Sequence, residues 1–277
     1  MSAIVWTIAA KEFGDNLRNR WLWMMTSVLV LLAFVVSVGG GVLQGAALLP
    51  SLGNQLAALV SLSLLLLPLA AILISYDSFV GEQESGTLLL LLTYPLTKWQ
   101  LILGKLVGHG LVLAAAMLVA FGGCAVFTAI YGTADVSEVV QGFGHFMLSG
   151  WLLAIIFVLI GYGVSLSVRE KAKALGVLLL VWFVFVLLYD LVILATVVSF
   201  ADALNRQWIN IAILINPADV FRSLNLAATP ALAGQGQSGL ASLQQLGVTS
   251  LSLYGALVTW LLVSLALCYW RFAVKRL

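Results

Sequence analysis

Charged residues are scarce in this sequence of 277 residues. Only 9% are Asp, Glu, Lys or Arg, whereas 62% belong to the apolar set of Ala, Val, Ile, Leu, Met, Phe, Trp, Tyr and Cys. Soluble chains carry roughly 25% charged residues, so too few ionisable side chains are present to cover a globule of this size. The scarcity excludes an ordinary water-soluble domain and predicts that lipid surrounds most of the surface.

Cysteine and histidine are also scarce, with two residues of each. Cys124 and Cys268 lie in separate apolar segments, which argues against a disulfide scaffold. His109 is expected at the opposite membrane face from His145, so the sequence predicts no metal cluster within one chain. His145 and Met147 are weak candidates for a transient soft-metal contact. The alternative interpretation is an interfacial histidine beside a packing methionine.

A phosphate-binding loop is missing as well. Such a loop needs the pattern G-x-x-x-x-G-K-[ST]. Before Gly104-Lys105, Trp99 stands where the first glycine belongs, and Leu106 stands where the hydroxyl belongs. We therefore expect that the chain is not an enzyme and holds no cofactor, and that another chain binds ATP if ATP drives the system.

What the sequence does contain is long apolar stretches, and about 20 apolar residues suffice to cross a bilayer as a helix. Each stretch must be helical, because an open strand in lipid would leave backbone groups without hydrogen bonds. The sequence predicts an all-α integral membrane protein with one transmembrane domain over residues 1–277. The six predicted spans are Trp21–Leu43, Leu56–Tyr76, Val107–Tyr131, Phe146–Val168, Ala174–Phe200 and Ser250–Trp270.

The basic residues predict the orientation of these spans. If the N-terminus is cytoplasmic, eleven of the 13 lysines and arginines fall on the cytoplasmic side, and only Arg206 and Arg222 fall outside. Both termini are therefore expected in the cytoplasm. The eleven are Lys11, Arg18, Arg20, Lys98, Lys105, Arg169, Lys171, Lys173, Arg271, Lys275 and Arg276.

Two regions outside the spans have a helical pattern of their own. Within residues 1–20, apolar side chains recur at helical spacing from Trp6 onward, which predicts an amphipathic helix lying in the cytoplasmic interface. The segment 201–249 is expected to be a periplasmic loop. Its first part is broken at Asn216-Pro217 and interrupted by Asp219 and Arg222, which indicates short membrane-dipping helices rather than a seventh span. Residues 233–245 are rich in Gly, Ser and Gln and predict a flexible connection.

The region between the second and third predicted spans, residues 77–106, has a distinctive pattern. A polar, acidic patch precedes five leucines, a run too short to span, and Pro95 then ends that helix. Lys98 and Trp99 anchor the return to the membrane. A cytoplasmic element held between two spans can transmit force from a soluble partner. An ordinary interfacial loop is the alternative.

The residue order G-E-x-E-S-G-T-L-x-x-L-L-x-x-P-x-x-x-x-x-L-x-x-G-K, from Gly81 to Lys105, resembles the signature of ABC-2-type transporter permeases. The resemblance implies that this segment contains the coupling helix that docks on a separate ATPase subunit, where ATP and Mg²⁺ bind. The loop Arg169-Glu170-Lys171 is a second candidate contact, with a topology anchor as the alternative. The main candidate contact residues are Glu82, Gln83, Glu84, Ser85, Gly86 and Thr87.

A narrower resemblance comes from the opening MSAIVWTIAAKEFGDNLRNRW and the overall length. Both are similar to the permeases of ABC complexes that mature the copper sites of nitrous oxide reductase. This resemblance implies a bacterial inner-membrane protein that pairs with a second copy of itself, with ATPase subunits and with a periplasmic protein. No residue pattern by itself indicates copper or sulfur.

Asp190 is exceptional because it lies near the middle of the fifth predicted span. A carboxylate there costs roughly 2.5–3.5 kcal/mol on insertion scales. Asp190 is expected to face the bundle interior, the axis of a dimer or a water-filled cavity. It would act either as part of a pathway or hinge or in a structural hydrogen bond to Ser, Thr, Tyr or backbone on a neighbouring helix. An ion-coupled secondary transporter using Asp190 is the alternative function, but that class usually has several intramembrane ionisable groups. A membrane enzyme lacks any catalytic constellation here.

Overall fold

The computed structural model describes residues 3–43, 49–199, 206–228 and 249–275, and regular structure within these ranges is helical. The long helices are α2 (Arg20–Leu43), α3 (Leu52–Ser75), α6 (Lys98–Met117), α8 (Val136–Ser167) and α15 (Ser250–Val274). The shorter ones are α1 (Ala3–Leu17), α4 (Val80–Glu84), α5 (Thr87–Thr93), α7 (Gly123–Tyr131), α9 (Lys171–Phe183), α10 (Tyr189–Ser199), α11 (Arg206–Ile215) and α12 (Pro217–Ala227). Two π-helical turns, η1 (Leu118–Gly122) and η2 (Val184–Leu188), interrupt the third and fifth spans.

Six helical segments are long and apolar enough to cross a membrane, as predicted. The third begins at Lys98 instead of Val107, because Thr97 and Gln100 form a capping box that starts the helix earlier. The fourth begins at Val136 instead of Phe146, since the first residues of this helix include polar side chains and lower its hydropathy there. The segments are Arg20–Gly39, Leu52–Glu84, Lys98–Tyr131, Val136–Ser167, Lys171–Thr196 and Ser250–Val274.

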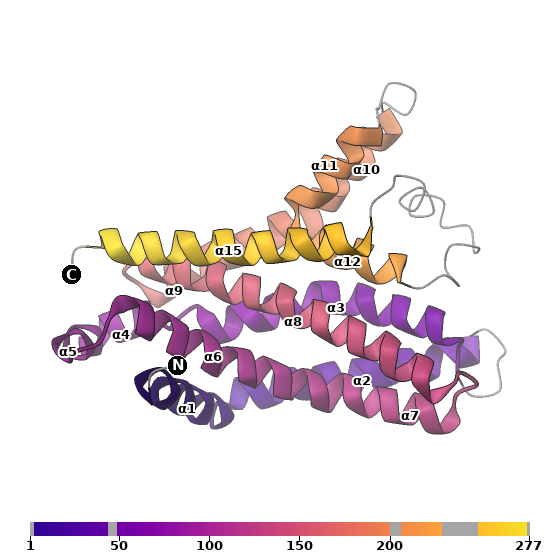
Figure 1. The fold of residues 1–277 in the computed structure, drawn as a ribbon, viewed down its shortest axis with the longest axis horizontal. Coiled ribbons are helices and arrows are strands. Elements are labelled where there is room, and N and C mark those ends of the chain that lie inside the picture. The colour runs from indigo at the N-terminus through magenta and orange to yellow at the C-terminus, as the bar shows by residue number, and fades with distance from the viewer. Residues whose placement is uncertain (1–2, 44–48, 200–205, 229–248, 276–277) are drawn as a thin grey trace.

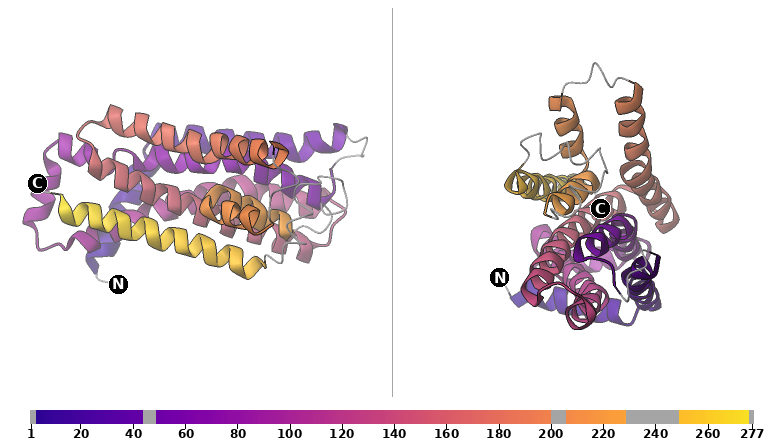
Figure 2. Two further views of the ribbon diagram at one scale, coloured as in Figure 1. Left: turned by 90° about the horizontal axis from the view of Figure 1, so that it is seen from above. Right: turned by 90° about the vertical axis from the view of Figure 1, so that its right-hand side faces the viewer.

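Helix α8 forms the centre of the bundle and packs against α3, α15, α6 and α12 (Figures 1 and 2). It carries a run of buried residues from Leu153 to Leu159, as expected for a helix that is apolar on all sides and buried. The two ends of the described chain lie at one end of the bundle, together with α4 and α5 (Figure 1). This end is called the terminal end below.

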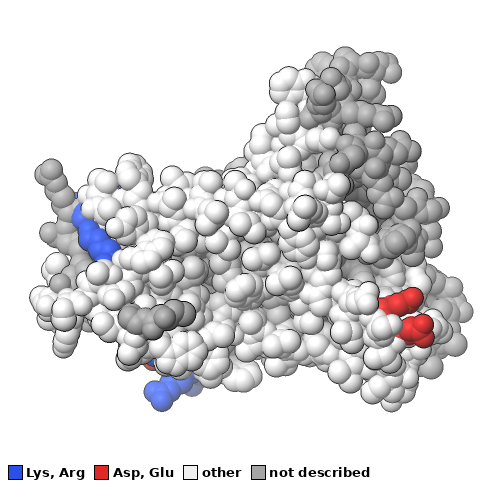
Figure 3. All heavy atoms as spheres, viewed as in Figure 1, with Lys and Arg blue, Asp and Glu red and all other residues white. Residues whose placement is uncertain are grey.

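On one face of the molecule, charged side chains lie toward the two ends. On the face shown in Figure 3, basic side chains lie toward the terminal end and acidic ones toward the opposite end, and the band between them shows neither. An uncharged band of this kind is what the hydrocarbon core of a bilayer requires. The orientation of the termini stays a prediction, and the basic character of the terminal end supports it.

The short helices α11 and α12 lie in the described part of the segment before the last span, as the sequence indicated. From η2 onward, α10 and α11 diverge from the bundle, and α12 returns to pack against α8 and α15 (Figure 1). The break falls at Asn216, whose side chain accepts a hydrogen bond from the backbone N–H of Ala218, with Pro217 in the first turn of α12. The depth of these helices in a membrane stays a prediction. The predicted connection at 233–245 lies outside the described residues.

Helix α1 packs along α6 through a face formed by Val5, Ala9, Glu12 and Asn16. The apolar side chain of Trp6 lies on another face and is exposed, so it is available to lipid. The interfacial position of this helix stays a prediction. The sequence did not predict the burial of the Glu12 carboxylate, and a buried carboxylate requires a nearby partner.

Candidate functional site

The α4–α5 element consists of two short helices joined by a tight bend, and it protrudes from the terminal end of the bundle. Its bend is at Gly86, which has a φ of 73°, a left-handed conformation that favours glycine. The hydroxyl groups of Ser85 and Thr87 lie 2.9 Å apart across the bend. The sequence G-x-L after the acidic patch therefore encodes a corner, and α5 runs from this corner to the Tyr94-Pro95 break.

A buried ion cluster anchors this element to the bundle. The Lys105 ammonium donates to Glu12 Oε1 at 2.7 Å and to Glu82 Oε1 at 2.8 Å. The Lys105 side chain is only 2% exposed, and its ammonium also lies 5.6 Å from the centre of the Phe79 ring. One cation on α6 thus joins helix α1 to helix α4.

Small residues on α6 allow α1 to come this close. A Cβ on Gly104 would lie 2.6 Å from the Ile8 side chain, and one on Gly108 would lie 2.7 Å from the Cβ of Glu12. Both distances are shorter than real Cβ contacts, so only glycine fits at these two positions. The glycine spacing on α6 therefore sets the position of Glu12 beside Lys105.

A second set of contacts holds the start of α4 against α8. The Ser165 hydroxyl accepts hydrogen bonds from the backbone N–H groups of Phe79 and Val80 at 3.2 and 2.9 Å. The rings of Phe79 and Tyr162 pack edge to face, with centroids 5.3 Å apart, and the Tyr162 hydroxyl bonds to His109 Nδ1. These hydrogen bonds in a buried site keep the geometry of α4 defined.

Electrostatics favour the charged form of Glu12. Burial alone would raise its pKa, but Lys105, His109 and Lys11 together lower the pKa below the usual value of 4.5. A carboxylate with a depressed pKa stabilises the folded protein above its unfolded pKa, and this contribution is lost as the pH falls through the folded pKa.

A pH titration of stability tests this linkage. The difference in melting temperature between the wild type and Glu12→Gln is expected to be largest near about pH 7 and to shrink below about pH 4.5. Asp15→Asn is the matched control, because Asp15 is exposed and forms only a surface pair with Lys11, so it should follow the wild type. A Glu12→Gln difference of equal size at about pH 4 and about pH 7 would contradict the assignment.

The predicted ATPase-contact residues divide into two groups. Glu82 and Gln83 turn inward, Glu82 to Lys105 and Gln83 to the ammonium of Lys275. The outward-facing residues are Glu84, Ser85, Gly86 and Thr87. The second predicted contact lies directly beside them, because Glu84 Oε1 accepts a hydrogen bond from the backbone N–H of Lys171 at 2.8 Å. Arg169 and Glu170 are exposed next to it. The structure therefore brings the two predicted contacts together on one surface, and their role as an ATPase interface stays a prediction.

Helix α5 adds an exposed apolar patch to this surface. Leu89 and Leu90 are 58% and 64% exposed, and Tyr94 at the end of the helix is 65% exposed. Helix α5 lies between two of the membrane-spanning segments and belongs to neither. Large apolar side chains exposed together outside the spans mark a surface that another molecule covers.

Asp190 has a partner that sequence reasoning missed. The Arg222 guanidinium donates to both of its carboxylate oxygens, at 2.6 and 2.8 Å, and also bonds to Asp219. Asn216 in turn donates to Asp219 at 3.0 Å. Asp190 thus has a charged partner rather than the uncharged one that the structural alternative expected, and the bond joins residues 32 positions apart. The pathway or hinge role stays a prediction. The available signal was Arg222 itself, because a lone carboxylate in a span calls for a nearby cation.

The weak metal candidates do not gather further ligands. His145 Nδ1 and the Tyr254 hydroxyl are 3.0 Å apart, so this ring nitrogen already has a hydrogen-bond partner. Met147 is half-buried against the apolar core. Across the described ranges, no three His, Cys, Asp or Glu side chains are grouped in a way that could hold a metal ion. Both cysteines are free and buried.

Comparisons with known proteins agree with this architecture. Residues 6–277 match the family model described as ABC-2 family transporter protein. A Pseudomonas aeruginosa protein named "Probable ABC transporter permease protein NosY" is 42% identical over 270 residues, which cover 97% of this chain and 98% of that relative. A protein of the same name from Stutzerimonas stutzeri is 41% identical over 268 residues, 96% of each chain.

Proposed function

The chain belongs to the ABC-2 family of transporter proteins, and on that premise we propose that it is the NosY-type permease of a complex powered by a separate ATPase. In this proposal a NosF-like subunit binds ATP and Mg²⁺ and docks on the α4–α5 element. Two copies of the permease form the transmembrane unit in a bacterial inner membrane, and a NosD-like protein lies on the periplasmic side. The complex serves assembly of the copper sites of nitrous oxide reductase.

The observation that carries the proposal is the way α4–α5 is built. Its outer surface offers Glu84, Ser85, Thr87 and the exposed leucines of α5, and its inner surface is fixed by Lys105. A partner that pushes on this element moves α1, α6 and α8 with it, because the ion cluster and Ser165 join them. Rigid coupling of this kind is what a permease without its own nucleotide site needs.

Two kinds of output fit such a permease. In one, a sulfur- or copper-containing species is exported, and in the other the motion performs mechanical work on the periplasmic partner. The uncharged band on the face shown in Figure 3 and the pairing of Asp190 with Arg222 offer little to a hydrophilic cargo. These features favour mechanical work. They also count against an ion-coupled secondary transporter, because the Asp190 carboxylate is already bound by a guanidinium.

Replacing one exposed leucine tests the docking surface. Leu90→Glu is expected to reduce co-purification of a co-expressed NosF-type ATPase by about tenfold, since a carboxylate must be desolvated in an apolar contact. Leu251→Glu is the matched control, because Leu251 is 82% exposed in the first turn of α15, at the opposite end of the bundle. Undiminished recovery of the ATPase with Leu90→Glu, in a protein that melts like the wild type, would refute the docking assignment.

A further inference from the structure

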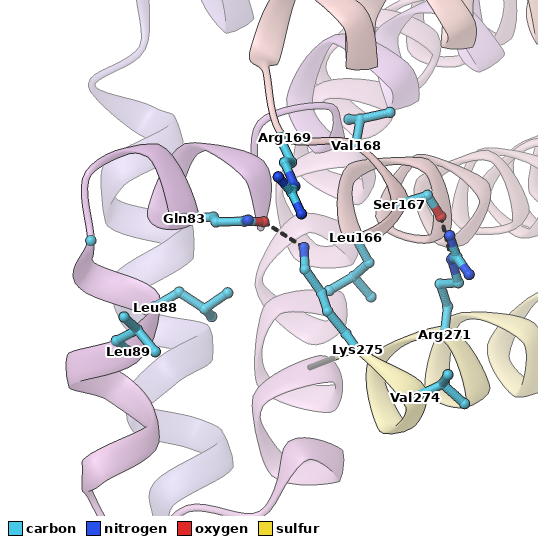
Figure 4. A pocket seen from close by; sticks show the side chains of 11 residues that line it. Gln83, Leu88, Leu89, Leu166, Ser167, Val168, Arg169, Arg271, Val274 and Lys275 are labelled. Carbon is cyan, nitrogen blue, oxygen red and sulfur yellow. Dashed lines mark hydrogen bonds between the residues drawn. The ribbon is translucent and has the colours of Figure 1, made fainter. Parts of the chain in front are cut away.

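A cavity of about 500 Å³ opens at the terminal end of the bundle (Figure 4). Its walls come from the α4–α5 turn, from the residues after α8 and from the last turn of α15. These three segments are far apart in the sequence and meet only in the folded protein. The cavity adjoins the docking surface and shares Gly86, Leu89 and Arg169 with it.

Three cationic side chains converge on this cavity: Arg169, Arg271 and Lys275. Arg271 Nε donates to the Ser167 hydroxyl at 2.7 Å, and Lys275 Nζ donates to the Gln83 amide oxygen at 2.5 Å. Both acceptors are uncharged. Within the described ranges, no carboxylate forms an ion pair with any of the three cations.

The three positive charges reinforce one another. Burial lowers the pKa of Lys275, and the guanidinium groups of Arg271 and Arg169 lower it further. Like charges held this close, with only neutral acceptors between them, create a positive potential that an anion would relieve. The cavity is thus prepared for a negatively charged group.

The remaining walls of the cavity are apolar. Leu88 and Leu89 line it from α5, Leu166 lines it from the end of α8, and Val274 lines it from the end of α15. A small inorganic anion would leave these walls in contact with water. A ligand that carries both an anionic group and a hydrocarbon chain would satisfy the cations and the apolar walls together.

Aromatic side chains place the cavity at headgroup depth. Tyr269 and Trp270 directly precede Arg271, and the Tyr269 ring packs edge to face on Trp99 with centroids 5.3 Å apart. Trp99 and Trp270 are exposed. Tryptophan and tyrosine collect at the membrane–water interface, so Arg271 and Lys275 lie in the layer of lipid phosphates.

We propose that this cavity binds an anionic phospholipid, with the lipid phosphate held by Arg169, Arg271 and Lys275 and an acyl chain along Leu88 and Val274. Basic pockets between transmembrane helices on the cytoplasmic side recognise anionic headgroups by the same chemistry. The lipid would connect the α4–α5 turn to the ends of α8 and α15. This site is a property of the chain alone and does not depend on the identity of the ATPase or of any cargo.

Native mass spectrometry of the full-length, delipidated protein tests the site, with dioleoyl-phosphatidylglycerol and dioleoyl-phosphatidylcholine as probes. One phosphatidylglycerol is expected to bind at least about tenfold more tightly than phosphatidylcholine. Arg271→Gln/Lys275→Gln should remove about tenfold or more of that affinity. Arg18→Gln/Lys173→Gln is the matched control, because it removes one exposed arginine and one exposed lysine outside the cavity. Arg271→Lys should retain most of the binding.

Several results would overturn the proposal. Equal affinity for the two lipids would do so, as would unchanged binding by the double variant at a wild-type melting temperature. Complete displacement by millimolar inorganic phosphate would show that the acyl chain contributes nothing. If the double variant loses ATPase association but keeps the lipid, the cavity instead receives an acidic side chain of the partner. Should the double variant fail to fold, Lys275→Gln alone provides the same comparison, because Lys275 lies after the last turn of α15.

Discussion

Lys105→Met is expected to lower the free energy of unfolding by about 3–5 kcal/mol, because it leaves the buried Glu12 carboxylate and the part-buried Glu82 carboxylate facing each other without a cation. Glu12 and Glu82 both bond to the Lys105 ammonium. For a chain of this size, such a loss corresponds to a fall of about 10 °C in melting temperature. The measurement is thermal unfolding of the purified protein in detergent, followed by tryptophan fluorescence.

Two further variants isolate the electrostatic cause of that loss. Lys173→Met removes an exposed lysine that forms a surface ion pair with Glu170, and it should change the melting temperature little. The triple variant Lys105→Met/Glu12→Gln/Glu82→Gln should recover much of the loss, since it removes the charges together. A triple variant as unstable as Lys105→Met alone would show that packing, not charge, accounts for the effect.

Arg222→Leu is expected to have an effect of similar size, about 3–5 kcal/mol, because Asp190 and Asp219 would lose their shared cation. Asp190→Asn should cost clearly less, since Arg222 keeps its bond to Asp219. Thermal unfolding of the two variants side by side measures the difference. Arg18→Leu, at an exposed position on the terminal end, is the control. Equal losses for Arg222→Leu and Asp190→Asn would contradict a guanidinium shared by two carboxylates.

A triple variant that removes all three charges of this ion cluster separates a structural role of Asp190 from a role in a pathway. If Asp190 only anchors Arg222, then Asp190→Asn/Arg222→Gln/Asp219→Asn should fold and support normal copper and sulfur incorporation into the reductase. Loss of incorporation in a variant that melts like the wild type would assign Asp190 to a pathway or hinge.

The sequence predicted the spans well because hydropathy is a local property. Each span of about 20 apolar residues is visible without knowledge of its neighbours, and the corner at Gly86 and the break at Pro95 are equally local signals. The predicted start of the fourth span was ten residues too late, because the first part of the helix, from Val136 to His145, mixes polar and apolar side chains.

The ion pairs could not be predicted, because they join residues that are distant in the sequence. Lys105 bonds to Glu12 across 93 residues and to Glu82 across 23. From the sequence, Lys105 was only one of eleven cations that set the topology, and Glu82 was an outward contact for the ATPase. Only the close packing of α1 on α6 shows that the lysine is buried and that Glu82 faces inward.

The π-helical turn η2 has a consequence for the whole fifth span. A π-helical turn contains about one residue more than an α-helical turn, and each residue in an α-helix advances the direction of the side chains by about 100°. The π-helical turn absorbs this extra residue. If Val184–Leu188 were ordinary α-helix with the same number of residues, everything after it would be rotated by about 100°, and the Asp190 carboxylate would turn away from Arg222. The π-helical turn therefore sets the direction in which Asp190 points.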